Sequence, residues 1–305
     1  MVAGCATVSE PPVQGPPSSP EAYSLFGTPL IAAPLSADTR DTLESRLGRA
    51  QAEYDRNPAD ADAAIWLGRR TAYLGRFRDA IGIYSASLGQ HPKDARLYRH
   101  RGHRYLTLRR FESAIADLDQ AARLIEGQPD QIEPDGIPNA RNTPTSTLQS
   151  NVWYHLALGQ YLTGDFEKAR HSYERCREVS NNPDQLCATT YWQWQTLVRL
   201  GRMEEAERLL QPIRDDFDLI ENHDYFHLLQ LYRGRVTADT LLASAMRRGG
   251  TTFATVGYGV AGWHLASGRR TEAIAAMRQV MAGDAWAAFG HIAAEAELHR
   301  LGVRP

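Results

Sequence analysis

Residues 61–94 and 95–128 repeat each other without a gap, at a spacing of 34 residues. The matched positions hold small, aromatic and aliphatic residues in the same order: Gly68 with Gly102, Phe77 with Phe111, Ala80 with Ala114, and Ile81 with Ile115. A fixed period of this length is typical of stacked supersecondary units. Each unit has the pattern of a helical hairpin, which cannot bury its apolar face alone. The repeat therefore predicts a stacked, all-helical array.

The composition is compatible with such an array. Of the 305 residues, 43% are apolar and 23% are charged, which excludes intrinsic disorder and a collagen-like chain. No run of about 18 apolar residues occurs, so we expect no membrane-spanning helix. Length alone suggests about two domains. The repeat overrules that expectation and favours one continuous array.

The repeated residues resemble the tetratricopeptide repeat (TPR) family. Residues 61–94 carry Leu67-Gly68, Gly75, Phe77, Ala80, Tyr84 and Pro92 in the family's register. Further copies follow at 150–183, 187–220 and 254–285, and a degenerate pair lies at 225–234 and 238–246. The resemblance implies an all-α fold, a right-handed α-solenoid of TPR-like helical hairpins over residues 38–300. We expect about six helical pairs and a final helix from Ala285 to Leu298.

Proline divides the chain into four parts. Residues 1–37 predict a flexible, proline-rich tether, and residues 38–128 hold the first repeats. Residues 129–149 are a proline-rich insertion where a short turn would suffice, and residues 150–305 hold the later repeats and the capping helix. Loops of that length within an array are often functional. Two interpretations stay open for this one: a functional loop, or a tolerated insertion whose acidic residues are solvated.

The amino terminus resembles the lipobox of bacterial lipoproteins. Val2-Ala3-Gly4 precedes Cys5, and small, polar and proline-rich residues follow. The resemblance implies diacylation of Cys5 and a place in the cell envelope or periplasm, with the membrane reached only through this anchor. Only four residues precede Cys5, so the charged and apolar regions of a signal peptide are absent. We expect the true start to lie upstream; with Met1 as the start, the protein would be cytoplasmic.

The other two cysteines, Cys176 and Cys187, fall at neighbouring positions of consecutive repeats. A disulfide between them is one expectation for an oxidising compartment, and two buried thiols that fill the core are the other. No Cys-x-x-Cys pair occurs, which argues against a zinc ribbon or a thioredoxin-type redox site.

Motifs for catalysis are weak. Gly257, Gly259 and Gly262 fit a dinucleotide-binding spacing, but the helical context favours close helix packing instead. His223 and His227 share a helical face, and we expect them to form an inward-facing packing pair rather than a metal site. We expect no catalytic residue, no metal ion and no cofactor.

Charge is unevenly distributed. The whole chain has 34 Lys and Arg against 36 Asp and Glu, a formal net charge of -2, so a globally basic nucleic-acid binder is not expected. Between Asp60 and Arg110, however, eleven basic residues face four acidic ones, a local charge of +7. Arginine-rich surfaces favour anionic partners.

The TPR resemblance implies a concave groove lined by first-helix side chains. Carried onto this chain, the groove holds arginines beside tyrosines and a histidine: Arg69, Tyr73, Arg96, Arg99, His103, Tyr154 and Tyr161. Guanidinium groups suit bidentate capture of carboxylates. We therefore expect an extended peptide with acidic residues or a free carboxyl end. Phosphate or an anionic polysaccharide would satisfy the same arginines, and pairing with Asp62 and Asp94 would leave no site.

These patterns together predict a non-catalytic adaptor or scaffold. Its partner would be a protein or an acidic peptide bound in the concave groove, with a lipid anchor at Cys5 holding the scaffold in the envelope. The alternative is an accessory or regulatory subunit of a cytoplasmic enzyme complex, which contacts the enzyme through the 129–149 loop.

Overall fold

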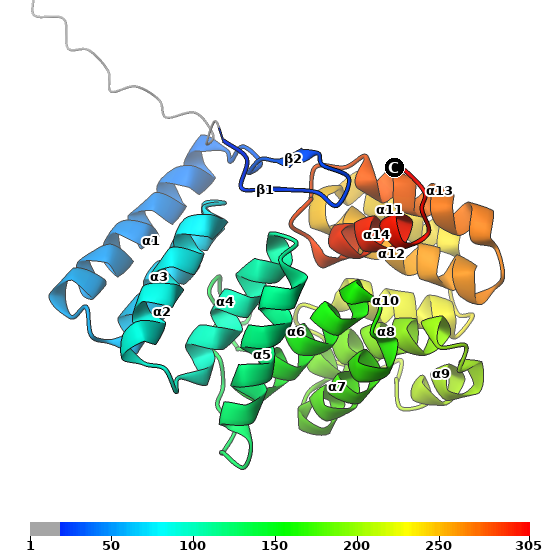
Figure 1. Ribbon diagram of the computed structural model, residues 1–305. Helices are drawn as coiled ribbons and strands as arrows, with labels where there is room; N and C mark the ends of the chain where they lie inside the picture. The colour runs from blue at the N-terminus through cyan, green and yellow to red at the C-terminus, as the bar shows by residue number, and fades with distance from the viewer. Residues whose placement is uncertain (1–18) are drawn as a thin grey trace, which may run out of the picture.

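The computed structural model describes residues 19–305 and consists almost entirely of α-helices (Figure 1). The array starts with α1 (Ala37–Arg56), whose amino end is capped by the Ser36 side chain. Six helical pairs follow: α2 (Ala61–Tyr73) with α3 (Phe77–Gln90), α4 (Ala95–Thr107) with α5 (Phe111–Ile125), α6 (Leu148–Thr163) with α7 (Phe166–Val179), α8 (Pro183–Arg199) with α9 (Met203–Leu209), α10 (His223–Tyr232) with α11 (Ala238–Arg248), and α12 (Gly250–Ala266) with α13 (Arg270–Met281). The predicted α-solenoid of TPR-like hairpins is confirmed.

The 34-residue period fixes the helix boundaries of the first two pairs. α4 begins and ends 34 residues after α2, and α5 begins 34 residues after α3. Asp60 and Asp94, also 34 apart, cap α2 and α4 by accepting hydrogen bonds from backbone N–H groups. A Cβ atom at Gly68 would lie 2.3 Å from the Tyr84 ring, so the glycine allows α3 to approach α2.

The final helix, α14 (Phe289–Arg300), begins four residues later than predicted. The preceding turn places Trp286 in the apolar cluster of α2 and α3, edge-on to the Phe77 ring at 5.6 Å between centroids. A helix that started at Ala285 would carry Trp286 on its own surface. Packing of this indole accounts for the shift.

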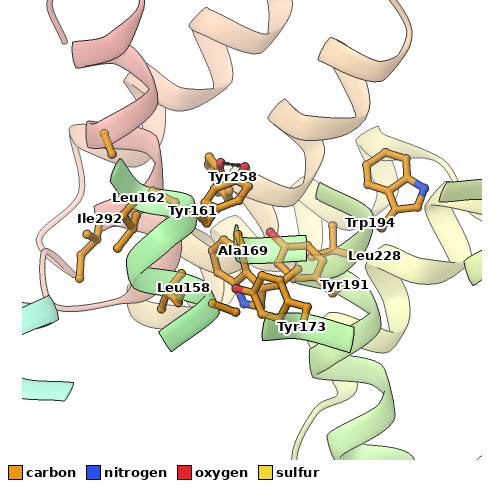
Figure 2. Packing of buried hydrophobic residues seen from close by; sticks show 14 of the residues in the cluster. Leu158, Tyr161, Leu162, Ala169, Tyr173, Tyr191, Trp194, Leu228, Tyr258 and Ile292 are labelled. Atoms are coloured by element: carbon orange, nitrogen blue, oxygen red, sulfur yellow. Dashed lines mark hydrogen bonds between the residues drawn. The ribbon is translucent and has the colours of Figure 1, made fainter. Parts of the chain in front are cut away.

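The solenoid curves until its carboxyl-terminal helices cover its inner face. α14 contacts α6, and α12 contacts α8 and α14, as their proximity in Figure 1 shows. Leu158 and Leu162 of α6 lie near Ile292 of α14 in the same buried cluster (Figure 2). This packing buries first-helix side chains that an open solenoid would present to solvent.

The predicted flexible tether is wrong for residues 19–36. They form a small antiparallel hairpin, β1 (Ala22–Tyr23) and β2 (Pro29–Leu30), followed by an extended segment. The Leu25 N–H donates to Oε1 of Glu295 at 2.6 Å, and Nε1 of Trp286 donates to the Ile31 carbonyl at 2.6 Å. The hairpin therefore joins the first repeats to the carboxyl-terminal helix. The rest of the predicted tether, with Cys5, lies outside the described residues.

Candidate functional site

The seven predicted groove residues divide into two groups. Arg69 and Tyr73 on α2 and Arg96 and Arg99 on α4 surround the proline-rich loop, here residues 126–147 between α5 and α6. We call these four residues, with Arg70, the basic face. The other three predicted residues lie apart from the loop: Tyr161 is in the protein core, and His103 and Tyr154 are half-buried.

The prediction that Tyr161 lines an open groove is wrong, and His103 and Tyr154 are half-buried against aromatic side chains. The His103 ring lies 5.3 Å from the Phe289 ring at the start of α14, and the Tyr154 hydroxyl pairs with that of Tyr225 at 3.2 Å. Tyr161 is fully buried and shares a hydrogen bond with the Tyr258 hydroxyl of α12 (Figure 2). The physical reason is that α12 and α14 fold back over the inner face, which the family pattern leaves open.

The loop is anchored at its base and at its far end. At the base, the Glu133 N–H donates to the Ser146 carbonyl at 3.0 Å, next to an isolated bridge between Ile132 and Thr147. At the far end, Arg141 forms a two-pronged ion pair with Asp218, with both N–O distances 2.6 Å. These anchors stretch the loop across the inner face.

Between its anchors, the loop contacts the basic face through one carboxylate and two carbonyls. Nη2 of Arg99 lies 2.9 Å from Oε1 of Glu133, and the two side chains are only 9% and 11% exposed. Nη2 of Arg69 donates to the Pro134 carbonyl at 2.8 Å, and Nη1 of Arg70 donates to the Gly136 carbonyl at 2.5 Å. The face thus holds an extended acidic segment of the chain itself.

Gly136 is buried against the basic face, where no larger residue fits. A Cβ atom there would lie 1.5 Å from the Tyr73 hydroxyl oxygen and 2.9 Å from Nη2 of Arg69. Tyr73 itself is partly buried. Shape, as well as charge, therefore selects the segment at this position.

A tryptophan orients the two adjacent arginines. The guanidinium carbons of Arg69 and Arg70 lie 4.5 Å and 4.8 Å from the centroid of the Trp66 ring, within cation–π range. Stacked guanidinium groups lose less rotamer freedom when they bind a ligand. The sequence prediction missed Trp66 and Arg70, although Arg70 lies in the same basic segment as Arg69.

Arg96 is paired with acidic residues of the helices, as one of the alternatives for the predicted arginines had it. It contacts Asp62 and its own helix cap, Asp94, with Nη2 2.6 Å from Oδ2 of Asp94. These hydrogen bonds raise the pKa of Arg96. Arg96 still borders a cavity of about 230 Å³ beside Glu133 and Pro134, so it lies at the edge of the site.

Positive charge exceeds negative charge on the side of the basic face that the loop covers. Burial lowers the pKa of Arg104 to about 10, and Arg99 and Arg69 are among its positive neighbours. Burial first, and then Arg99, hold the pKa of His100 well below its ordinary value, so this imidazole is neutral near pH 7. Among residues 19–305, Glu133 supplies the carboxylate that pairs with Arg99. The site is therefore suited to an anionic group.

Comparisons with known proteins show distant similarity to tetratricopeptide repeat proteins. No family model matches the chain. Tetratricopeptide repeat protein 12 of Mus musculus is 20% identical over 177 residues, which cover 58% of this chain and 21% of the mouse protein. The chain thus spans about a fifth of that relative's length.

Two solved structures illustrate the likeness. A tetratricopeptide repeat protein from Parabacteroides merdae gives a TM-score of 0.46 at 15% identity, over 81% of this chain and 89% of that one. YrrB, described as a TPR protein with an unusual peptide-binding site, gives 0.43 at 14% identity, over 83% and 98%. Both TM-scores are below 0.5, so the fold assignment rests on the chain's own repeats. This chain is a tetratricopeptide-like α-solenoid.

The disulfide expected within this solenoid is absent. Cys176 and Cys187 are free and buried, and Sγ of Cys176 lies 3.2 Å from Oγ1 of Thr189. Burial raises the pKa of both thiols to about 12. Cys176 and Cys187 are therefore two buried thiols that fill the core, which was the alternative to a disulfide.

The structure also shows where the histidine pair and the glycine motif of the sequence lie. His223 and His227 are both exposed at the start of α10, so the expected inward-facing packing pair is wrong. The glycines of the dinucleotide-like motif lie in α12 and allow close packing, since a Cβ atom at Gly259 would lie 2.5 Å from Leu228.

Proposed function

We propose that this solenoid is a non-catalytic protein-binding scaffold whose basic face takes an extended acidic segment of a partner protein. The observation that carries the proposal is the seating of the acidic segment 133–136 across Arg69, Arg70 and Arg99. Two of those contacts use backbone carbonyls, which every peptide offers, and one uses a carboxylate, which selects acidic sequences. The combination favours a peptide over free phosphate or a polysaccharide.

Partner capture tests this proposal. We expect a tagged chain carrying Arg69→Glu and Arg96→Glu to lose proteins that the wild-type chain retains, because reversed charges repel an acidic segment. The matched control reverses two exposed arginines away from the face, Arg123→Glu with Arg247→Glu. Equal recovery by the face variant and the control, measured by quantitative mass spectrometry, would sink the proposal.

A second candidate function has one observation in its favour. Ile132 and Ile137 flank the docked segment and are 70% and 56% exposed, so the outer edge of the loop presents apolar area. Such residues suit contact with a larger partner, as in an accessory subunit of an enzyme. Loss of partners in Ile132→Ser with Ile137→Ser, but not in the arginine variant, would favour this second function.

We further propose that a lipid on Cys5 tethers the scaffold to a bacterial membrane. The support is the lipobox-like Val2-Ala3-Gly4-Cys5 and the proline-rich residues after it. None of the helices in residues 19–305 is long and apolar enough to cross a bilayer. Metabolic labelling with an alkyne fatty acid tests the anchor in the protein expressed from its own gene with the upstream coding sequence: the wild-type protein should be labelled and Cys5→Ser should not, and an unlabelled wild type contradicts the proposal.

A further inference from the structure

The loop that crosses the basic face is held there by contacts that are incomplete. Oε2 of Glu133 and Nε of Arg99 are both buried without a hydrogen-bond partner. A buried polar atom without a hydrogen-bond partner is destabilising, because it has lost its hydration without replacement. The ion pair therefore leaves one donor atom of Arg99 and one acceptor atom of Glu133 without a hydrogen bond.

We propose that residues 132–137 are a built-in ligand of the basic face, and that a partner must displace them with a segment of the same chemistry: a glutamate, an extended backbone after it and, three residues after that glutamate, a glycine. This inference rests on the proposed function and adds to it the kind of partner segment and its competition with the loop. Each feature has its own contact on the face. Glu133 pairs with Arg99, Pro134 offers its carbonyl to Arg69, and Gly136 fits against Tyr73.

The loop can leave the basic face while the helices of the solenoid stay folded. Its far anchor is the exposed pair between Arg141 and Asp218, and solvent screens such exposed ion pairs, so they contribute little to stability. Its base is fixed to the amino end of α6 through Gln131 and Leu148. A released loop thus stays tethered beside the face, where an intramolecular ligand acts at an effective concentration on the order of millimolar.

A second argument concerns what the loop hides. With the loop seated, Arg99 is 7% exposed and inaccessible to a protein partner. Displacement replaces one buried carboxylate by another, so the charge of Arg99 never lacks a counter-ion. A partner segment that also contacts Nε of Arg99 gains a hydrogen bond that the loop does not make.

A peptide added in trans tests the proposal. The probe is a fluorescent peptide with the sequence of residues 129–139, and its affinity is measured by fluorescence anisotropy. The opened protein is Gly136→Ala, whose new methyl group would collide with the Tyr73 hydroxyl group, and we expect this collision to displace the loop. The matched control is Gly89→Ala, at an exposed helical glycine with nothing within 4 Å of the added carbon.

We expect Gly136→Ala to bind the peptide at least about tenfold more tightly than the wild type and Gly89→Ala, because the competing loop is gone. A peptide with Gln in place of Glu133 should bind Gly136→Ala about tenfold more weakly than the native peptide. Nδ2 of Asn139 also donates to Oε1 of Glu221 at 2.9 Å at the far end of the loop. Should Gly136→Ala fail to fold, Asn139→Ala with Arg141→Ala loosens this far end and supplies the same comparison.

Two results would overturn the inference: equal affinity of the wild type and the opened protein, or no binding by an opened protein whose circular dichroism is native. Neither result touches partner recovery through Arg69 and Arg96. If recovery depends on those arginines while the peptide result is negative, the scaffold function stands and the built-in ligand does not.

Discussion

At the residue scale, one position shows how the repeat is adapted to close the molecule. In the first hairpin the turn holds Gly75 at φ +77°, and 34 residues later the same turn holds Arg109 at φ +61°. A non-glycine residue there costs about 1–2 kcal/mol. Arg109 is retained because its buried guanidinium pairs with Glu295 of α14 at 2.7 Å and donates to the Trp286 carbonyl at 2.8 Å.

Replacement of this arginine separates backbone strain from the buried ion pair. Arg109→Gly relieves the left-handed backbone but leaves the fully buried Glu295 without its counter-ion. We expect the free energy of unfolding, measured with urea, to fall by about 3–5 kcal/mol. Arg110→Ala, at the adjacent exposed arginine, is the control and should change it by less than about 1 kcal/mol. An equally stable Arg109→Gly protein would show that the pair does not hold α14.

The sequence predicted that Arg69 and Arg99 lie on the inner face, but not that the chain's own loop contacts them there. Their position on first helices follows from the 34-residue frame, whereas Glu133 lies in a segment with no periodicity. The signals available were the loop's length and its acidic residues, which left a functional loop and a tolerated insertion equally open. Burial of Glu133 against Arg99 now favours the functional interpretation.

At the element scale, the helices could be predicted and the irregular segments could not. Gly68 and Phe77 recur at Gly102 and Phe111, so the repeat fixes α2 to α5 almost residue by residue. The hairpin of residues 19–36 has no such repeat. Its contacts reach residues more than 250 positions away, as in the hydrogen bond from Leu25 to Glu295, and local patterns carry no information about them.

Two neighbouring first helices carry buried histidines that make the fold sensitive to acid. His100 on α4 and His155 on α6 are almost fully buried, and burial holds the pKa of each well below its ordinary value. On acidification, the unfolded chain binds protons near pH 6.5 while the folded sites stay neutral. Stability is therefore complete above about pH 7 and is lost as the pH falls through 6.5.

We expect each of these histidines to remove about 1.4 kcal/mol from the free energy of unfolding at pH 5.5 relative to pH 7.5. Urea titrations at the two pH values measure the loss. His155→Phe should reduce this loss of unfolding free energy by the amount that one histidine contributes. His171→Asn, at an exposed histidine of α7, should leave the loss unchanged. An identical loss in His155→Phe and the wild type would rule out His155 as a contributor.

At the scale of the whole molecule, three segments of the chain fill the inner face of its own solenoid. α14 and α12 cover the later first helices, the amino-terminal hairpin joins the first repeats to α14, and the 126–147 loop covers the basic face. The family resemblance implies an open groove, whereas Tyr161 is fully buried and His103 is half-buried against the start of α14. The burial of these side chains depends on how far the solenoid curves, and no single repeat encodes that.

Docking of the loop on the basic face can be measured directly by a double-mutant cycle on stability between Arg99→Met and Glu133→Gln. The two side chains meet only when the loop is seated. Urea unfolding of both single variants and the double variant should give a coupling energy of about 1–3 kcal/mol. Arg99→Met with Asp130→Asn is the control cycle, because Asp130 belongs to the same loop but accepts backbone N–H groups of Gln131 and Gln149. A coupling between Arg99 and Glu133 no larger than in the control cycle would contradict a seated loop.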